Sequence, residues 1–226
     1  MNTPYKVYIT LCLTALVLIG CSRKNDSFVS RNFHAVTTEY NTLYNGYNAL
    51  EQGRNTLNES YADNYWEILP VERMQVSDQV VLPGQSKNAD FERAEEKAVK
   101  AVQKHGMNIN GKERNPQIDE AYLLLGKARY FDQRFVPAME AFNYILYKYP
   151  ASDKINQARI WREKANLRLE NTELAITNLK RLLYQVELKG QDLADATSML
   201  AEGYIAMEYL DSAITQLEIA SKATKS

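Results

Sequence analysis

Cysteine is almost absent from this chain: Cys12 and Cys21 are the only two among its 226 residues. Cys12 lies in an apolar run, from Val7 to Ile19, of the kind that export signals contain before they are removed. Removal of that run would leave one cysteine, so no disulfide could form within the remaining chain. We therefore expect the folded part to be stabilised by side-chain packing.

An excess of positive charge is also lacking. The chain has 27 Lys and Arg residues against 28 Asp and Glu residues, which gives a formal net charge of −1. Nucleic-acid binding depends on clustered positive charge, so we expect no nucleic-acid partner. After the first twenty residues, no stretch is apolar over the roughly 20 residues that a membrane-spanning helix needs.

Histidine is equally scarce, since His34 and His105 are the only two and lie far apart. Two histidines without neighbouring ligand patterns do not indicate a zinc site or a histidine-based triad. The run from Gly106 to Lys112 has the spacing of a phosphate-binding loop, but Glu113 stands where a Mg²⁺-binding Ser or Thr is required. We expect no metal, no nucleotide, no other cofactor and no enzymatic activity, although folding could still bring two carboxylates together.

The start of the chain predicts a lipid anchor. Lys6 precedes the apolar run, and Leu18 to Cys21 resembles the lipobox at which bacterial lipoproteins are cleaved and acylated. We expect residues 1–20 to be a lipoprotein signal peptide, Cys21 to be lipidated, and residues 21–30 to form a lipidated tether. Several acyl chains anchor firmly, since each buried methylene contributes ~0.8 kcal/mol. The alternative is an ordinary signal cleavage site beside which Cys21 is simply a small residue.

Apolar and small residues recur at helical spacing from Asp119 to Pro150, and this pattern predicts two helices joined by a tight turn. Their order matches the tetratricopeptide pattern, with landmarks at Tyr122, Leu125, Gly126, Phe135, Ala138, Phe142 and Pro150. Small residues at Gly126 and Ala138 would let the paired helices approach closely. The landmark of Ala138 returns at Ala175 and Ala213, at intervals longer than the standard period of about 34 residues.

The sequence therefore predicts an all-α fold, a tetratricopeptide-like (TPR) stack of irregular helical hairpins over residues 89–226. The second repeat departs most from the pattern, because Glu163 occupies the close-crossing position that Gly126 holds in the first. No polar capping helix follows the third repeat, although such arrays usually end in one. We therefore expect the array to continue in a longer protein.

Residues 31–88 are predicted to form an N-terminal helical region with a long apolar insert. Arg31 to about Tyr61 has a helical pattern, weakened by Gly46 and Gly53. From Phe91 to His105 a second amphipathic helix follows. Its apolar face consists of Phe91, Ala94, Ala98 and Val102.

The insert, Ala62 to Asn88, contains Pro70 and Pro83 but is too apolar for a solvated linker. A long segment of this kind is often functional. Alternatively, it covers the N-terminal end of the helical stack, since exposed apolar ends need covering. We favour the cover, and keep Tyr65 and Trp66 as candidate partner-binding residues.

The first helices of the repeats predict a second candidate binding surface. Basic and aromatic residues alternate at the positions that line the inner face of such an array: Lys127, Tyr130, Phe131, Lys164, Leu167 and Arg168. They could grip an acidic or extended peptide through charge and aromatic contacts. The alternative is ordinary packing for Phe131 and Leu167, with solvated charges nearby.

Four short strings carry a resemblance to a known family. They are Phe28 to His34, Tyr44 to Gly46, Asn64 to Pro70, and Asn115 to Tyr122. With these strings the chain resembles, over essentially all of its mature length, the SprE/PorW lipoproteins of the Bacteroidota type IX secretion and gliding-motility apparatus.

The resemblance implies a periplasm-facing lipoprotein of the outer membrane that links the periplasmic ring of the secretion machine to its outer-membrane translocon. Its partners would be protein components of that complex, and it would contact the membrane through its lipid. Two other classes also combine a lipid anchor with helical repeats. One is a BamD-like lipoprotein of outer-membrane protein assembly, and the other is a SusD-like glycan-binding lipoprotein.

Overall fold

The computed structural model describes residues 22–76 and 88–224. Within these ranges the chain is almost wholly helical, and the only strands are β1 (Asn108–Ile109) and β2 (Lys112–Glu113), which pair antiparallel. The all-α prediction is confirmed. The predicted signal peptide and Cys21 lie outside the described residues. No helix within them combines the length and the apolar character needed to cross a membrane.

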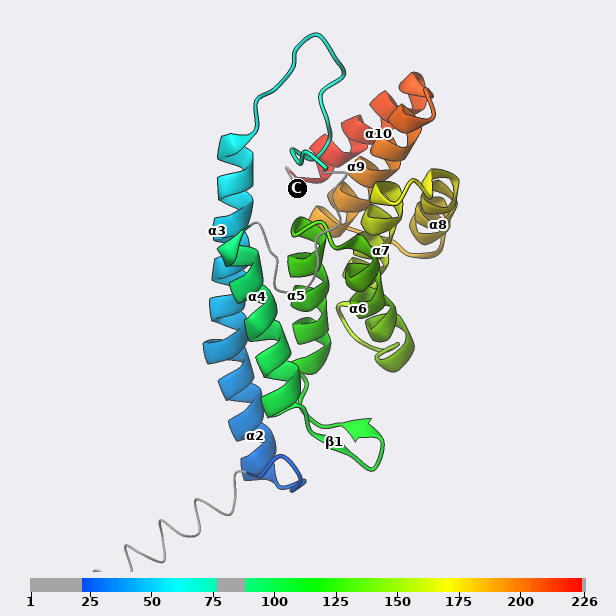
Figure 1. The fold of residues 1–226 in the computed structure, drawn as a ribbon. Coiled ribbons are helices and arrows are strands. Elements are labelled where there is room, and N and C mark those ends of the chain that lie inside the picture. The colour runs from blue at the N-terminus through cyan, green and yellow to red at the C-terminus, as the bar shows by residue number, and fades with distance from the viewer. Residues whose placement is uncertain (1–21, 77–87, 225–226) are drawn as a thin grey trace, which may run out of the picture.

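One long helix begins the fold (Figure 1). It consists of α2 (Phe28–Thr37), the π-helical segment η1 (Thr38–Leu43) and α3 (Tyr44–Ser60). The helix continues through Gly46 and Gly53, and both are buried within α3. A Cβ atom at Gly53 would lie 2.8 Å from Cδ1 of Phe91 on the neighbouring helix. The glycine therefore permits a close helix contact.

That neighbouring helix consists of α4 (Ala89–Lys100) and the π-helical segment η2 (Ala101–His105). The predicted apolar face is confirmed, since Phe91, Ala94 and Ala98 are buried and Val102 packs against the same core cluster. The helix lies between α3 and α5.

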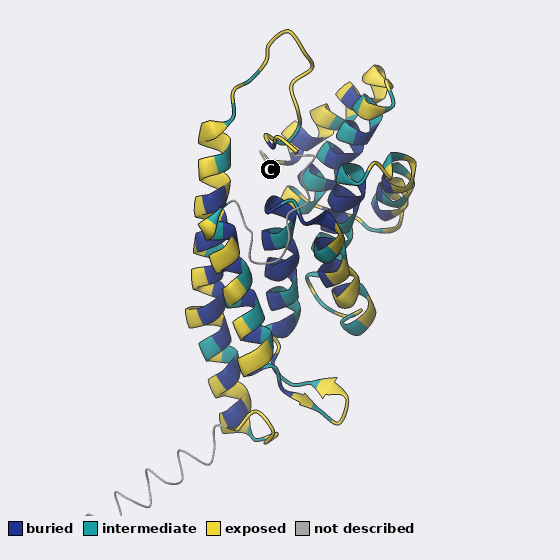
Figure 2. Cartoon of the chain, in the orientation of Figure 1, coloured by how far each residue is buried: buried dark blue, intermediate teal, exposed yellow. Residues whose placement is uncertain are grey.

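The remainder of the chain forms helical hairpins packed in succession. They are α5 (Ile118–Phe131) with α6 (Phe135–Lys148), α7 (Ile155–Arg168) with α8 (Thr172–Gln185), and α9 (Gly190–Ala206) with α10 (Leu210–Ala223). Figure 2 shows that the buried surfaces of these helices face one another. Helix α7 joins two core clusters, because Trp161 belongs to the cluster around α4 to α6 and Ile160 to the cluster around α8 and α9.

The three hairpins share one turn geometry. Each turn contains a non-glycine residue with left-handed backbone, namely Gln133, Glu170 and Glu208, with φ of 60°, 62° and 62°. Five residues after each comes a buried alanine: Ala138, Ala175 and Ala213. A left-handed residue commonly ends a helix and reverses the chain. The repeated small residue therefore coincides with a repeated backbone turn.

The run that resembles a phosphate-binding loop is the β1–β2 hairpin. Asn110 and Gly111 form its turn with positive φ, of 52° and 78°. Oε1 of Glu113 accepts hydrogen bonds from the backbone N–H groups of Met107, Arg114 and Asn115, at 2.7, 3.0 and 2.9 Å. The carboxylate thus accepts the hydrogen bonds of backbone amides that a bound phosphate would need.

A buried polar network joins the two π-helical segments. The Nδ1 atoms of His34 and His105 are 3.1 Å apart, within hydrogen-bond distance. Nδ2 of Asn115 donates to Oγ1 of Thr38 and to the carbonyl of His105, both at 3.0 Å. All four residues are buried. A hydrogen bond between two imidazoles requires at least one of them to be neutral.

We expect the protein to lose stability as the pH falls below about 6.5, the ordinary pKa of histidine. Burial lowers the pKa of His105, and the nearby charges of His34 and Lys100 lower it further. The unfolded chain then binds the proton more readily than the folded chain, so the contribution is complete above 6.5 and falls below it. Melting temperatures between pH 5 and 8 should show a smaller slope for His105→Gln than for the wild type; equal slopes would contradict the expectation.

Candidate partner-binding site

Residues 61–76, which we call the strap, form a loop that runs back from the end of α3 towards α9 and α10 (Figure 1). Arg73 pairs with Asp63 through two hydrogen bonds, of 3.1 Å from Nε and 2.6 Å from Nη2. This bidentate pair joins the two limbs of the loop. The run from Ile68 to Val71 lines a cleft of about 470 Å³ together with side chains of α9 and α10.

The strap inserts one carboxylate, that of Glu72, between the first helices of the hairpins. Its Oε1 lies 2.8 Å from Nζ of Lys164, and its Oε2 lies 3.1 Å from Nη2 of Arg168. The Tyr130 hydroxyl donates to Oε2 at 2.5 Å and accepts from Nε of Arg168 at 2.9 Å. A second terminal nitrogen of Arg168 pairs with Glu202 on α9. We call Tyr130, Lys164, Arg168 and Glu202 the carboxylate seat.

Apolar contacts and one hydrogen bond also hold the strap. Met74 is buried in the main core cluster and Val71 packs against the second cluster. Nε2 of Gln133 donates to the carbonyl of Gln75 at 2.8 Å. The described part of the insert thus lies across α5, α7 and α9 and does not cover the N-terminal end of the stack, where α3 and α4 pack against α5. The expected cover is therefore wrong for residues 62–76, because helices already bury that end.

Burial and neighbouring charges shift the pKa values of the groups in the seat. Burial would raise the pKa of Glu72, but Lys164, Tyr130 and Arg168 lower it to about 2. Burial and the charge of Glu72 raise the pKa of Tyr130 well above its usual range. Burial, and then Glu72, raise the pKa of Glu202 although Arg168 opposes them. At neutral pH the seat therefore holds an ionised Glu72 and a neutral phenol that donates to it.

The predicted inner-face residues divide into two groups. Tyr130, Lys164 and Arg168 come together around Glu72 and are therefore occupied by the chain itself. Phe131 is ordinary core, since its ring stacks on Phe91 with centroids 5.6 Å apart. Lys127 lies 5.1 Å from the Trp161 ring centroid, and burial lowers its pKa to about 8.

Sequence reasoning missed three residues of this region. Trp161 lies beneath Lys164, whose Nζ is 4.1 Å from the ring centroid, and so provides an aromatic floor for the seat. Its position three residues before Lys164 on the same helix could have revealed it. Glu72 and Glu202 gave no signal, since the first lies in an irregular segment and the second among many helix-surface carboxylates.

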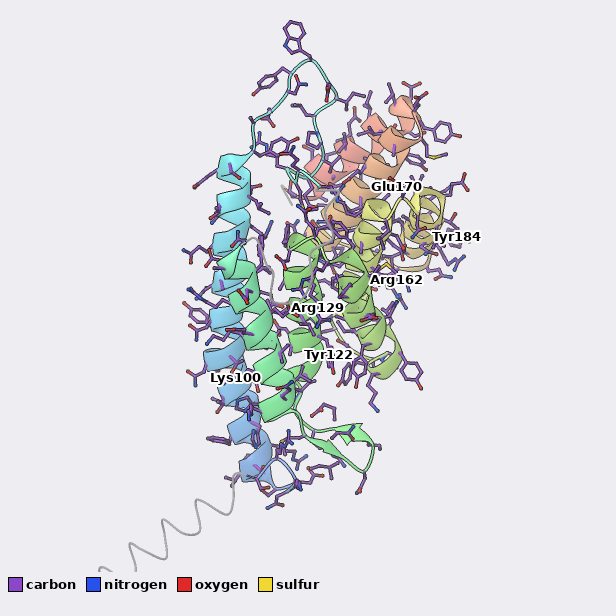
Figure 3. All side chains as sticks on the ribbon, viewed as in Figure 1. Lys100, Tyr122, Arg129, Arg162, Glu170 and Tyr184 are labelled. Carbon is purple, nitrogen blue, oxygen red and sulfur yellow. The ribbon has the colours of Figure 1, made fainter. Side chains whose placement is uncertain are left out.

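Tyr65 and Trp66 lie at the free end of the strap, and they are 80% and 97% exposed. The backbone N–H of Trp66 donates to Oδ1 of Asn64 at 3.2 Å, which forms a turn that presents the indole. Ile68 and Leu69 are also exposed. We call these four residues the apolar tip. Side chains project outward from this part of the strap in Figure 3.

Glu163, the residue that departs from the repeat pattern, is fully satisfied in its buried position. Its Oε1 accepts from Nε of Arg162 at 2.7 Å, and its Oε2 accepts from Nδ2 of Asn166 and of Asn178 at 2.7 and 3.1 Å. Asn178 lies on α8, so the carboxylate joins the two helices through polar contacts. In the first hairpin, Gly126 and the Phe142 ring make the equivalent contact by close packing.

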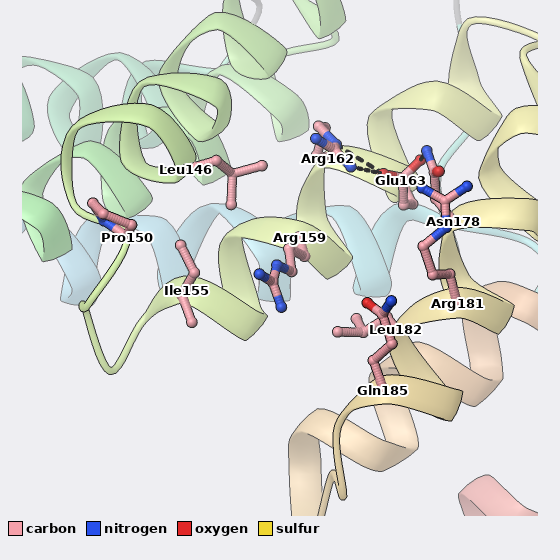
Figure 4. A pocket seen from close by; sticks show the side chains of 10 residues that line it. All are labelled: Leu146, Pro150, Ile155, Arg159, Arg162, Glu163, Asn178, Arg181, Leu182 and Gln185. Carbon is pink, nitrogen blue, oxygen red and sulfur yellow. Dashed lines mark hydrogen bonds and ion pairs between the residues drawn. The ribbon is translucent and has the colours of Figure 1, made fainter.

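Beside Glu163 lies a pocket of about 330 Å³ between α6, α7 and α8 (Figure 4). Arg159, Arg162 and Arg181 line it, together with Leu146 and Leu182. Neither Arg159 nor Arg181 forms an ion pair with any residue that the structure describes. The pocket therefore carries positive charge and could hold a carboxylate or a phosphate.

The described residues contain no cluster of metal-binding side chains. Across residues 22–76 and 88–224, no three His, Cys, Asp or Glu side chains lie together as a metal site would need. Both carboxylate oxygens of Glu72 are occupied, by two cations and a phenol. No family model and no curated protein matches the sequence.

Proposed function

We propose that this chain is a non-enzymatic scaffold that binds proteins, anchored to the outer membrane through lipid on Cys21 and facing the periplasm. Its body would be a tetratricopeptide-like array, and its partners would be components of the type IX secretion and gliding-motility machinery. The repeated turn at Gln133, Glu170 and Glu208 supports the array, because it recurs with the period of the small-residue landmarks.

The apolar tip is the observation that carries the proposal. Three of the strings behind the family resemblance supply buried residues, for example His34, Gly46 and Asn115, and the fold accounts for them. The fourth string contains Tyr65 and Trp66, which are exposed and contribute little to the core. Exposed aromatic residues on an ordered loop are typical anchors of protein interfaces.

The position of the tip favours a protein partner over the anchoring membrane. The loop that follows α3 extends past the end of this helix, at the opposite end of the long helix from the start of α2 (Figure 1). At ~1.5 Å per residue, the helix from Phe28 to Ser60 is roughly 50 Å long. A lipid on Cys21 would therefore allow the end of the long helix that carries the strap to lie up to about one helix length from the membrane surface.

Replacing Tyr65 and Trp66 together with alanine is expected to block type IX cargo secretion and gliding without unfolding the protein. Loss of aromatic anchors worth 2 kcal/mol or more weakens binding about 30-fold. Exposed changes usually alter stability by less than about 0.5 kcal/mol. The measurements are secreted cargo, gliding speed and the melting temperature of the purified variant.

Tyr147→Ala with Tyr184→Ala is the matched control, since these tyrosines are 87% and 92% exposed on α6 and α8. Figure 3 shows Tyr184 on α8, pointing away from the stack. Normal secretion by the tip variant would remove the tip from the proposal. Normal secretion after deletion of the whole gene would remove the secretion role, and a defect in barrel assembly or glycan uptake would favour a BamD-like or SusD-like role.

A further inference from the structure

The carboxylate seat has the features of a peptide-binding site, yet its ligand comes from the same chain. Glu72 reaches Lys164 and Arg168 from positions 92 and 96 residues away in the sequence. The strap that delivers it is irregular, and most of its residues are exposed. Lys164 and Trp161 are buried beneath the carboxylate, so the seat is partly desolvated.

We propose that the seat also binds an acidic residue in an extended segment of a protein partner, which takes the place of Glu72 and displaces the strap. The proposal rests on the scaffold function above and names the chemistry of one partner. The occupant is a peptide with a Glu or Asp side chain, because Tyr130, Lys164 and Arg168 all donate to one carboxylate.

The charges of the seat explain why another carboxylate is expected to replace that of Glu72. Lys164 and Arg168 are two buried or half-buried cations, and Glu202 is the one seat carboxylate that would remain without Glu72. Removal of one partner from a buried ion pair is strongly destabilising, since it leaves an uncompensated charge. A carboxylate from a partner therefore favours departure of the strap, because it keeps Lys164 and Arg168 paired.

The strap does not satisfy every polar atom of the carboxylate seat. Oε2 of Glu202 is buried and has no hydrogen-bond partner among the described residues, although Oε1 pairs with Arg168. A buried acceptor without a donor destabilises the folded chain. A partner segment with an N–H donor next to its carboxylate could satisfy this oxygen. The preferred peptide thus carries an acidic residue beside a donor such as Gln, Asn or Lys.

The test uses a labelled synthetic peptide of residues 61–76 in which Arg73 is replaced by Gln, so that trypsin does not cut it, and a matched peptide that also carries Glu72→Gln. The receiving protein is the full chain with residues 61–76 replaced by a Gly-Ser linker of equal length. We expect this variant to bind the Glu peptide at least tenfold more tightly than the Gln peptide. The wild type should bind both weakly, because its own strap competes at a local concentration of about millimolar. Lys164→Met in the receiving protein should abolish the preference.

Folding of the receiving protein is checked by circular dichroism and thermal melting. If it does not fold, the full chain with Glu72→Gln receives the same peptides, and the wild type is digested with trypsin in the presence of each. The Glu peptide, unlike the Gln peptide, should then accelerate cleavage after Arg73. Equal binding of both peptides by a folded variant, or equal cleavage with both, overturns the proposal. Such a result would leave the secretion experiment on the apolar tip unaffected.

Discussion

Gly126→Leu is expected to reduce the free energy of unfolding by about 3 kcal/mol, at the upper end of the usual cost of overpacking. A Cβ atom at Gly126 would lie 2.6 Å from Cζ of Phe142. That ring is fully buried and stands against Trp161, with centroids 6.3 Å apart, so it has little room to move. The helices α5 and α6 would have to separate.

Thermal melting measures this effect, and a shift of roughly 6 to 12 °C is expected for a chain of this size. Gly126→Ala is the sharper test, because alanine favours a helix by up to about 1 kcal/mol over glycine. A lower melting temperature for Gly126→Ala would therefore show that the contact outweighs helix propensity. Asn143→Leu, on the exposed face of α6, is the control for added apolar volume. An unchanged or higher melting temperature for both Gly126 variants would mean that the close crossing is absent.

Glu72→Gln is expected to release the strap and to reduce stability by about 3 kcal/mol at neutral pH, since Lys164 and Arg168 lose their shared carboxylate. The same contribution depends on pH. The pKa of Glu72 is about 2 in the folded protein, below its ordinary value of 4.5. The carboxylate therefore stabilises the fold fully above pH 4.5, and this stabilisation is lost as the pH falls towards 2.

Melting temperatures from pH 2 to 7 test both parts of this expectation. The wild type should lose more stability than Glu72→Gln between pH 4.5 and 2, so the two curves should converge in acid. Glu67→Gln is the matched control, because Glu67 lies exposed in the same loop. Parallel curves for wild type and Glu72→Gln would show that the ion pairs contribute little. Faster tryptic cleavage after Arg73 in Glu72→Gln at neutral pH would locate the loss in the strap.

Local sequence patterns were sufficient to predict the helices. The apolar face of Phe91, Ala94 and Ala98 is buried as its spacing predicts, because helical periodicity follows from the backbone of a single segment. Gly46 and Gly53 were harder to interpret. A glycine has the same intrinsic cost in any helix, and only the neighbouring Phe91 and Leu124 show that these two glycines permit close packing.

Glu113 and Glu163 also show the difference between what the sequence predicts and what the folded structure adds. The sequence identified both as misfits, one in a phosphate-loop pattern and one in a repeat. The structure gives each a structural role, since Glu113 accepts three backbone amides and Glu163 joins α7 to α8. A pattern can show that a residue departs from a family rule, but the groups that satisfy it come from the folded neighbourhood.

The sequence by itself determined that the described chain is helical, where the first hairpin begins and ends to within a few residues, and that the Tyr65–Trp66 segment is unusual. The tertiary structure alone decided that the strap crosses the stack, that Glu72 occupies the seat of Tyr130, Lys164 and Arg168, and that the aromatic tip remains exposed. The physical reason is the range of the interactions. Helix formation depends on residues three or four positions apart, whereas the path of an irregular loop depends on ion pairs and packing between residues more than fifty positions apart.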